Sequence, residues 1–195
     1  SKEQILINPS TTSFYGNSGT LCTEESPITP ISLYGITKYG AEKICMEREN
    51  SISFRFATIF GVAPRMRWDL MPNDFVMRAV QERALVLFDS KSVRTFLHID
   101  DAIRSYMMVF DNLKVMKGNV YNVGDESMNY SKMQLAEIIK KYVDFIIIDS
   151  TLTDFDKGDG FLFGATCYGI KPKNTNKNKS PQGLVTSEDY DVYNK

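Results

Sequence analysis

The segment Ser51-Ile-Ser-Phe-Arg-Phe-Ala-Thr-Ile-Phe60 decides the fold. It is rich in β-branched and aromatic residues and is followed by Gly61, which predicts a strand over residues 51–60. A second apolar run, residues 4–8, ends at Pro9 and a hydroxyl-rich cluster, the pattern of a buried parallel strand that enters a loop. Between them, residues 33–48 are rich in helix formers. Strand, helix and strand predict a βαβ unit and hence an α/β protein.

The rest of the chain continues the mixture of helices and strands. Helices are predicted over 73–83, 99–111 and 132–143, and strands over 85–88, 94–99, 119–123 and 145–148. Residues 171–183 are polar and of low complexity, which is typical of a disordered linker or tail. We therefore divide the chain into residues 1–63, residues 64–150 and a divergent, partly disordered tail over residues 151–195.

Charge and hydropathy exclude several classes of function. The 195 residues include 23 Lys and Arg against 24 Asp and Glu, a formal net charge of -1. Nothing in this balance would attract nucleic acid or an anionic membrane, so neither is an expected partner. No stretch approaches the roughly 20 apolar residues of a membrane span, and the first residues lack the apolar centre of a signal peptide. We expect a cytoplasmic protein.

The cysteines and the single histidine do not predict a metal site. Cys22, Cys45 and Cys167 are far apart, and with His98 they form no spacing that is known to bind zinc. An odd number of cysteines suits a reducing compartment. His98 lies inside an apolar strand pattern, so we expect a buried histidine satisfied by hydrogen bonds and not a catalytic one.

The stretch Tyr34-Gly-Ile-Thr-Lys38 places a phenol and an ammonium group four residues apart, on one face of the predicted helix. A cation a few ångströms from a phenol favours the phenolate, which can act as a base near neutral pH. A second pair, Tyr39 and Lys43, has the same spacing, but a shift of five residues turns a helix by about 140°, so both pairs cannot face one site. The spacing alone leaves a solvated helix face as an equal alternative for either pair.

Five segments together resemble the extended short-chain dehydrogenase/reductase family, which contains the nucleotide-sugar epimerases and dehydratases. They occur in the family's order and cover most of residues 4–150: Asn8-Pro-Ser-Thr-Thr-Ser-Phe-Tyr-Gly16, Tyr34-Gly-Ile-Thr-Lys38 with Glu42, Arg55-Phe-Ala-Thr-Ile-Phe-Gly61, Arg94-Thr-Phe-Leu-His-Ile-Asp-Asp101 and Tyr121-Asn-Val-Gly124. The resemblance implies the C-terminal part of a Rossmann-like, doubly wound parallel sheet. Residues 64–150 would form a small α+β substrate-binding region, interleaved with the last Rossmann elements.

The resemblance also implies roles for residues around a bound NAD. Thr11 would hydrogen-bond the reacting sugar oxygen, and Tyr34 would be the general acid and base. Lys38 would hold the nicotinamide ribose, with Tyr34 and Thr58 as further cofactor contacts. Tyr39 and Lys43 become bystanders. The sequence does not decide between NAD and NADP.

Substrate contacts follow from the same resemblance. Arg94 matches the arginine that holds the substrate diphosphate, a role that suits a planar, bidentate cation; the alternative is an arginine paired with Asp89 or another surface acid. Asn73 would also contact the substrate, or else cap a helix. Arg65 and Arg67 would either line the substrate entrance or be solvated loop residues.

The chain departs from the family's pattern in three places: a missing glycine-rich turn, residues 160–195, which match nothing in the family, and residues 12–13. It has no G-x-x-G-x-x-G, the turn through which the family binds the dinucleotide, so it resembles a fragment that begins midway through the sheet and is not expected to bind the cofactor tightly by itself.

The family's usual homodimer would pack through the helix over residues 33–48.

Thr12-Ser13 stands where the dehydratases carry an Asp-Glu pair, which disfavours dehydration. The prediction is NAD-dependent epimerisation of a nucleotide sugar through a transient keto sugar. The alternatives are a sugar reductase or dehydrogenase of the same family, and a truncated relative without catalytic activity.

Overall fold

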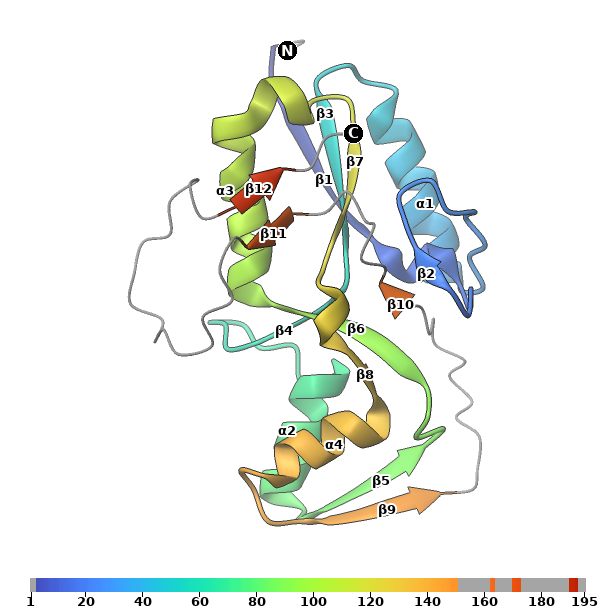
Figure 1. The fold of residues 1–195 in the computed structure, drawn as a ribbon, viewed down its shortest axis with the longest axis vertical. Coiled ribbons are helices and arrows are strands. Elements are labelled where there is room, and N and C mark those ends of the chain that lie inside the picture. Colours follow the sequence, from blue (N-terminus) through green and yellow to red (C-terminus); the bar gives the residue numbers. More distant parts are fainter. Residues whose placement is uncertain (1–2, 151–161, 164–169, 173–189, 193–195) are drawn as a thin grey trace.

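The computed structural model describes residues 3–150, 162–163, 170–172 and 190–192 (Figure 1). Its central sheet has three parallel strands in the order β1 (Leu6–Thr11), β3 (Ser51–Phe56) and β7 (Val120–Val123). The helices α1 (Leu33–Met46) and α3 (Ile99–Met116) flank this sheet on opposite sides in Figure 1. The predicted α/β class with a parallel sheet is confirmed.

The two faces of the central sheet differ in chemistry because side chains alternate along a strand. Ile52 and Phe54 belong to an apolar cluster that contains the buried residues of α3. Ser53 and Arg55, which alternate with them, form hydrogen bonds to Glu42 of α1. The sheet therefore has an apolar side toward α3 and a polar side toward α1.

The predicted strand over residues 51–60 is wrong in one respect, because it is two strands. β3 ends at Phe56, and β4 (Thr58–Phe60) starts after Ala57 and belongs to another sheet. That sheet has the order β4, β6 (Val93–His98) and β8 (Asn129–Ser131). The backbone N–H of Ala57 donates to the carbonyl of Val123, the last residue of β7, and Thr58 then pairs with Phe96. The chain therefore passes from one sheet to the other at Ala57, although the residues on both sides of Ala57 are of the same strand-forming types.

A second group of elements builds its own apolar cluster. It consists of α2 (Met71–Gln81), β5 (Ala84–Phe88), α4 (Lys132–Lys140) and β9 (Ile146–Ser150), and β5 pairs in parallel with β9. Phe75, Leu85, Ala136 and Phe145 are among the buried residues that the four elements share. Residues 64–150 contribute to this cluster and to the one at the central sheet; the domain boundaries stay a prediction.

Several short elements have no counterpart among the predictions. They are η1 (Thr12–Tyr15), β2 (Leu21–Cys22), η2 (Glu126–Met128) and the strand β8, together with β10 (Leu162–Phe163), β11 (Ile170–Pro172) and β12 (Tyr190–Val192). β10 pairs with β2, and β11 with β12. The predicted disorder of the tail concerns residues that lie mostly outside the described ones.

The predicted environment of His98 is wrong. Its side chain is 43% exposed at the end of β6, where the strand leads into α3. There His98 is the N-cap of α3, and its Nδ1 accepts a hydrogen bond from the N–H of Asp100. The apolar residues before His98 are buried, but the burial ends at Leu97.

Three helices differ in length from their predictions. α1 ends two residues early, at Met46, and α3 continues to Met116 through a non-helical residue, Asn112. α4, whose N-cap Ser131 forms a capping box, is shorter than predicted. In the described ranges, no helix combines the length and the apolar character that a membrane span requires.

Candidate functional site

A cavity of about 830 Å³ lies at the carboxyl ends of β1 and β3. Its walls come from both parts of the fold: the end of β1, the start of α1 and β4 on one side, and α2, β5, β6 and α4 on the other. Ligand sites of parallel α/β sheets form at this edge. The cavity is therefore the first place to look for the predicted site residues.

Thr11 is the last residue of β1 and lines the cavity. Its buried side chain caps the short helix η1: Oγ1 accepts a hydrogen bond from the N–H of Ser13 at 3.2 Å and donates one to the Ser13 hydroxyl at 3.0 Å. The chain then turns at Gly16, where φ is 67° and a Cβ would lie 2.3 Å from the carbonyl oxygen of Thr29. The turn explains why glycine is needed there.

Tyr34 and Lys38 line the same cavity from α1. Ser32 caps this helix by accepting from the N–H of Gly35 at 3.1 Å, which places Tyr34 in the first turn with 56% of the side chain exposed. The Lys38 ammonium group donates to the carbonyl of Pro9 on β1, the residue two before Thr11. This hydrogen bond ties the start of α1 to the strand that carries the hydroxyl.

The second tyrosine and lysine pair lies elsewhere. Tyr39 packs against Phe14, with ring centroids 5.4 Å apart, and Lys43 lies 5.7 Å above the Tyr39 ring. Neither Tyr39 nor Lys43 lines the cavity. The helix therefore presents only the first pair to it.

Thr58 and Arg94 line the cavity from the neighbouring strands β4 and β6. The Nε atom of Arg94 is buried and has no hydrogen-bond partner in the described part of the chain. None of the ion pairs formed by the described residues includes Arg94, so the pairing with Asp89 that the sequence left open is not found there. A buried N–H without a partner is costly, and an acceptor on a ligand would remove that cost.

Asn73 does not line the cavity. It lies in the first turn of α2, whose N-cap is Leu70, so it is not the helix cap that the sequence also allowed. Its side-chain amide donates to the carbonyl of Arg67 at 3.0 Å. Asn73 thus holds the loop before α2, and any effect on a ligand would pass through that loop.

Of the two loop arginines, Arg67 lines the cavity and Arg65 does not. Arg67 forms two parallel hydrogen bonds to Asp69, Nε to Oδ1 at 2.7 Å and Nη2 to Oδ2 at 2.6 Å. These hydrogen bonds from Arg67 lower the pKa of Asp69 from 3.8 to about 2. The cavity edge therefore carries a neutral pair at ordinary pH.

Lys132 is a wall residue that sequence reasoning missed. It begins α4, yet its side chain is buried in the cavity wall and its Nζ donates to the carbonyl of Phe88 at 2.9 Å. A lysine at the first position of an amphipathic helix gives no sign of burial, because this position is normally solvated. Only the approach of β5 to α4 creates its environment.

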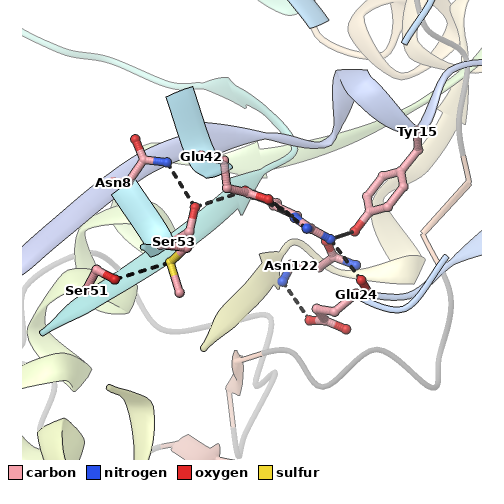
Figure 2. Close-up of polar contacts among 9 residues, drawn as sticks. Asn8, Tyr15, Glu24, Glu42, Ser51, Ser53 and Asn122 are labelled. Atoms are coloured by element: carbon pink, nitrogen blue, oxygen red, sulfur yellow. Dashed lines mark hydrogen bonds and ion pairs between the residues drawn. The ribbon is translucent and has the colours of Figure 1, made fainter. Parts of the chain in front are cut away.

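Sequence reasoning also missed a buried polar network between α1 and the sheet (Figure 2). Arg55 of β3 and Glu42 of α1 form its centre, with Nη2 to Oε1 at 2.7 Å. Arg55 Nη1 donates to the Tyr15 hydroxyl at 2.6 Å, and Tyr15 donates to Asn122 Oδ1 at 2.8 Å. Burial raises the pKa of Tyr15, an effect that the nearby Arg55 charge opposes. Glu42 and Arg55 were part of the motif segments but had been given no role.

Within residues 3–150 and the short described strands beyond them, no group of three or more His, Cys, Asp or Glu side chains is arranged to hold a metal ion.

The parallel α/β sheet, with a Tyr–Lys helix and a cavity at the carboxyl ends of its strands, belongs to the Rossmann-like class. The sequence profile of the NAD dependent epimerase/dehydratase family matches residues 2–124, and the chain belongs to this family.

Relatives and solved structures agree with this membership. The chain is 29% identical over 127 residues to the uncharacterized UDP-glucose epimerase YtcB of Bacillus subtilis (strain 168), covering 62% of this chain and 39% of that protein. It is 27% identical over 201 aligned positions to the UDP-glucose 4-epimerase of Lactobacillus helveticus, covering 89% of this chain and 60% of that protein.

The fold matches that of UDP-glucuronic acid 4-epimerase from Bacillus cereus in complex with UDP-glucuronic acid and NAD, with a TM-score of 0.73 and 24% identity over 84% of this chain and 54% of that chain. The chain thus spans between about 40% and 60% of the length of these proteins.

Proposed function

We propose that the protein epimerises a nucleotide sugar through a transient keto sugar, with NAD as the cofactor and Tyr34 as the acid and base. One observation carries the proposal: Thr11, Tyr34, Lys38 and Arg94 come from three separate elements, β1, α1 and β6, and line one cavity. A tyrosine and lysine pair on a solvated helix gives no reason to expect a buried hydroxyl beside it, or an arginine that forms no ion pair with the other described residues.

Each of these residues has a task in the proposed reaction. The Tyr34 phenolate takes the proton from the reacting sugar hydroxyl and returns it at the end, while the Thr11 hydroxyl holds the same sugar oxygen by a hydrogen bond. Lys38 follows Tyr34 by about one helical turn and lines the same cavity. Arg94 holds the diphosphate through charge-assisted hydrogen bonds. Tyr34, Lys38 and Thr58 would hold NAD, which would supply the hydride acceptor and donor that the exchange at the sugar carbon requires.

The described residues suit the reacting end of the dinucleotide. Tyr34, Lys38 and Thr58 would contact the nicotinamide ribose, and the wall beside them includes Ser10, whose buried Oγ has no hydrogen-bond partner in the described structure. The pyrophosphate end would need a glycine-rich turn, and the 195 residues contain no G-x-x-G-x-x-G. We therefore assign to this chain the reaction centre and the substrate side of the site.

A nucleotide sugar is the proposed substrate class because the relatives carry that chemistry in their names, UDP-glucose and UDP-glucuronic acid among them. Dehydration is not proposed. Residues 12 and 13 are Thr and Ser, which have no carboxyl group for the elimination of water. Their hydroxyls are engaged instead in hydrogen bonds, Thr12 with the carbonyl of Phe56 and Ser13 with Thr11.

The test is turnover of UDP-glucose and UDP-glucuronic acid by the full-length protein with NAD, followed by NMR of the sugar. Tyr34→Phe removes the proton-accepting oxygen but keeps the ring, so turnover should fall by at least about 10²-fold while the nucleotide sugar still binds. Tyr39→Phe, on the pair that faces away from the cavity, is the matched control and should keep wild-type turnover. Unchanged turnover in Tyr34→Phe would refute the role of Tyr34.

The same experiment separates epimerisation from net redox chemistry. In an epimerase the absorbance of reduced cofactor stays constant over many turnovers, because the hydride returns to the sugar. A steady change in that absorbance would instead identify a reductase or dehydrogenase.

We also propose a homodimer built on α1. Leu33 and Ile44 are 75% and 69% exposed, and eleven residues on a helix correspond to a rotation of only about 20°, so they lie on one side. The opposite side carries the buried residues Gly35 and Glu42. The exposed apolar side of α1 is therefore available to a second copy, and we expect the dimer to be cytoplasmic.

A further inference from the structure

Helix α1 is attached to the central sheet by polar contacts. Of its 14 residues, only Gly35 and Glu42 are buried. Glu42 meets Ser53 and Arg55 of β3, whereas the apolar residues of that strand face the other side of the sheet. Apolar contacts are non-directional, but a hydrogen-bonded ion pair has a defined geometry. The attachment of α1 is therefore sensitive to the length and shape of these polar side chains.

Arg55 holds Glu42 with several hydrogen bonds at once. Its Nη2 is 2.7 Å from Glu42 Oε1, and its Nε is 3.1 Å and 3.2 Å from the two carboxylate oxygens. The Ser53 hydroxyl donates to Oε2 at 2.9 Å and itself accepts from the Asn8 amide at 3.0 Å (Figure 2). Both charged residues are at least nine-tenths buried, with exposures of 3% and 5%. Burial by itself would lower the pKa of Arg55, but its contacts with Glu42 and Tyr15 together raise it.

The same guanidinium contacts the segment that follows Thr11. Arg55 Nη1 donates to the Tyr15 hydroxyl at 2.6 Å, and the guanidinium carbon lies 5.0 Å from the centre of the Phe14 ring. Phe14 and Tyr15 belong to η1, for which Thr11 is the N-cap. One buried cation thus contacts both α1 and η1, the two segments that present Tyr34 and Thr11 to the cavity.

Glu42 is placed where a shift would be transmitted to the site. It follows Lys38 by four residues and Tyr34 by eight, which are rotations of about 40° and 80° around the helix. Lys38 is itself hydrogen-bonded to Pro9 on β1. A displacement of the helix at Glu42 would therefore move Tyr34 and Lys38 relative to Thr11, since a short α-helix moves as a unit.

We infer that Glu42 and Arg55 are positioning residues, which set the distance between Tyr34 on α1 and Thr11 at the end of β1 through a buried ion pair shared by both segments. The inference rests on the proposed function, because it assigns the pair a role in the reaction of Tyr34 and Thr11. Neither residue lines the cavity, so neither touches the substrate.

The decisive variant is Glu42→Asp in the full-length protein. It keeps the charge but shortens the side chain by one methylene, so α1 must move toward β3 or the ion pair must lengthen. A displacement of about 1 Å can cost about 10²-fold in rate. We expect kcat to fall at least about tenfold, while KM for the nucleotide sugar changes less than about threefold because the substrate contacts at Arg94 are unaffected.

Two controls separate positioning from loss of stability. Glu47→Asp makes the same change on an exposed residue at the end of α1 and should keep the wild-type kcat. Met116→Ala removes a fully buried side chain at the end of α3, in the cluster on the other side of the sheet, so it destabilises the fold without touching the ion pair. Equal kcat in Glu42→Asp and Glu47→Asp, or an equal loss of kcat in Met116→Ala, would overturn the inference.

Amide hydrogen exchange gives a readout that does not need turnover. Glu42→Asp should speed exchange selectively in α1 and η1, whereas Met116→Ala should not. If the wild-type protein turns over no nucleotide sugar, the proposed function fails, and selective exchange in α1 and η1 would still support the structural half of the inference. Uniform exchange, or none beyond that of Glu47→Asp, would overturn that half too.

Discussion

The Asp69 carboxylate lines the cavity and forms an ion pair with Arg67. A carboxylate there would repel an anionic ligand, but the Arg67 guanidinium covers both of its oxygens at 2.7 Å and 2.6 Å. Bidentate pairs of this kind are the stronger class of surface contact. The Arg67–Asp69 pair therefore adds no net charge to the lining of the cavity.

The pH dependence of this pair follows from the direction of the shift. The pKa of Asp69 in the folded chain is about 2, against an ordinary value of 3.8. Because the folded value is depressed, the contribution of the pair is fully present above pH 3.8 and is lost as the pH falls through about 2. A carbon-detected NMR titration of the Asp69 carboxyl should show a midpoint near 2, and Arg67→Gln should return it toward 3.8. Arg65→Gln is the control and should leave it near 2; a wild-type midpoint at 3.8 would contradict the pairing.

At the scale of the element, α1 has two faces with different tasks. Its buried side is polar and meets the sheet through Glu42, and its outer side exposes Leu33, Ile36 and Ile44. A helix normally buries its apolar residues and exposes its polar ones. The reversed pattern of α1 is what we would expect of a helix with a second partner on its outer side.

The dimer proposal is tested on this outer side. Ile44→Asp places a charge on the exposed apolar side of α1. It should therefore weaken dimerisation at least tenfold, measured as the protein concentration at which light scattering reports the monomer mass. Ile103→Asp, on the exposed side of α3, is the matched control and should not change the mass. A wild-type protein that stays monomeric at all concentrations would contradict the proposal.

The helices and strands could be predicted from the sequence better than the contacts between them. The helix over residues 33–48 and the Tyr34–Lys38 face follow from local rules, and α1 ends only two residues earlier, at Met46. The ion pair of Glu42 with Arg55 could not be predicted, because a charged residue in a strand indicates an exposed face until its partner, 13 residues away, is known. The end of β3 before Ala57 could not be predicted for a similar reason. The two parts of the segment pair with different sheets, and the residue types of the segment do not show which strands they pair with.

At the scale of the whole molecule, the site exists only where distant segments meet. Thr11, Tyr34, Thr58 and Arg94 were placed in it by resemblance to a family, and the fold brings all four to one cavity. Lys132 was missed, because wall membership depends on how α2, β5 and α4 approach the sheet; Asn73 lies outside the wall, and its contact with the substrate stays a prediction. Short-range patterns carry no information on that approach.

We propose that Arg94 binds the diphosphate of a nucleotide sugar in the cavity, and calorimetric titration of the protein with UDP-glucose measures that binding. A charge-assisted hydrogen bond contributes about 1.5–3 kcal/mol, so Arg94→Gln should weaken binding by about 10- to 150-fold, while Arg65→Gln, a loop arginine outside the cavity wall, should bind like the wild type. Equal affinity of the wild type and Arg94→Gln, or no binding by the wild type, would contradict the account.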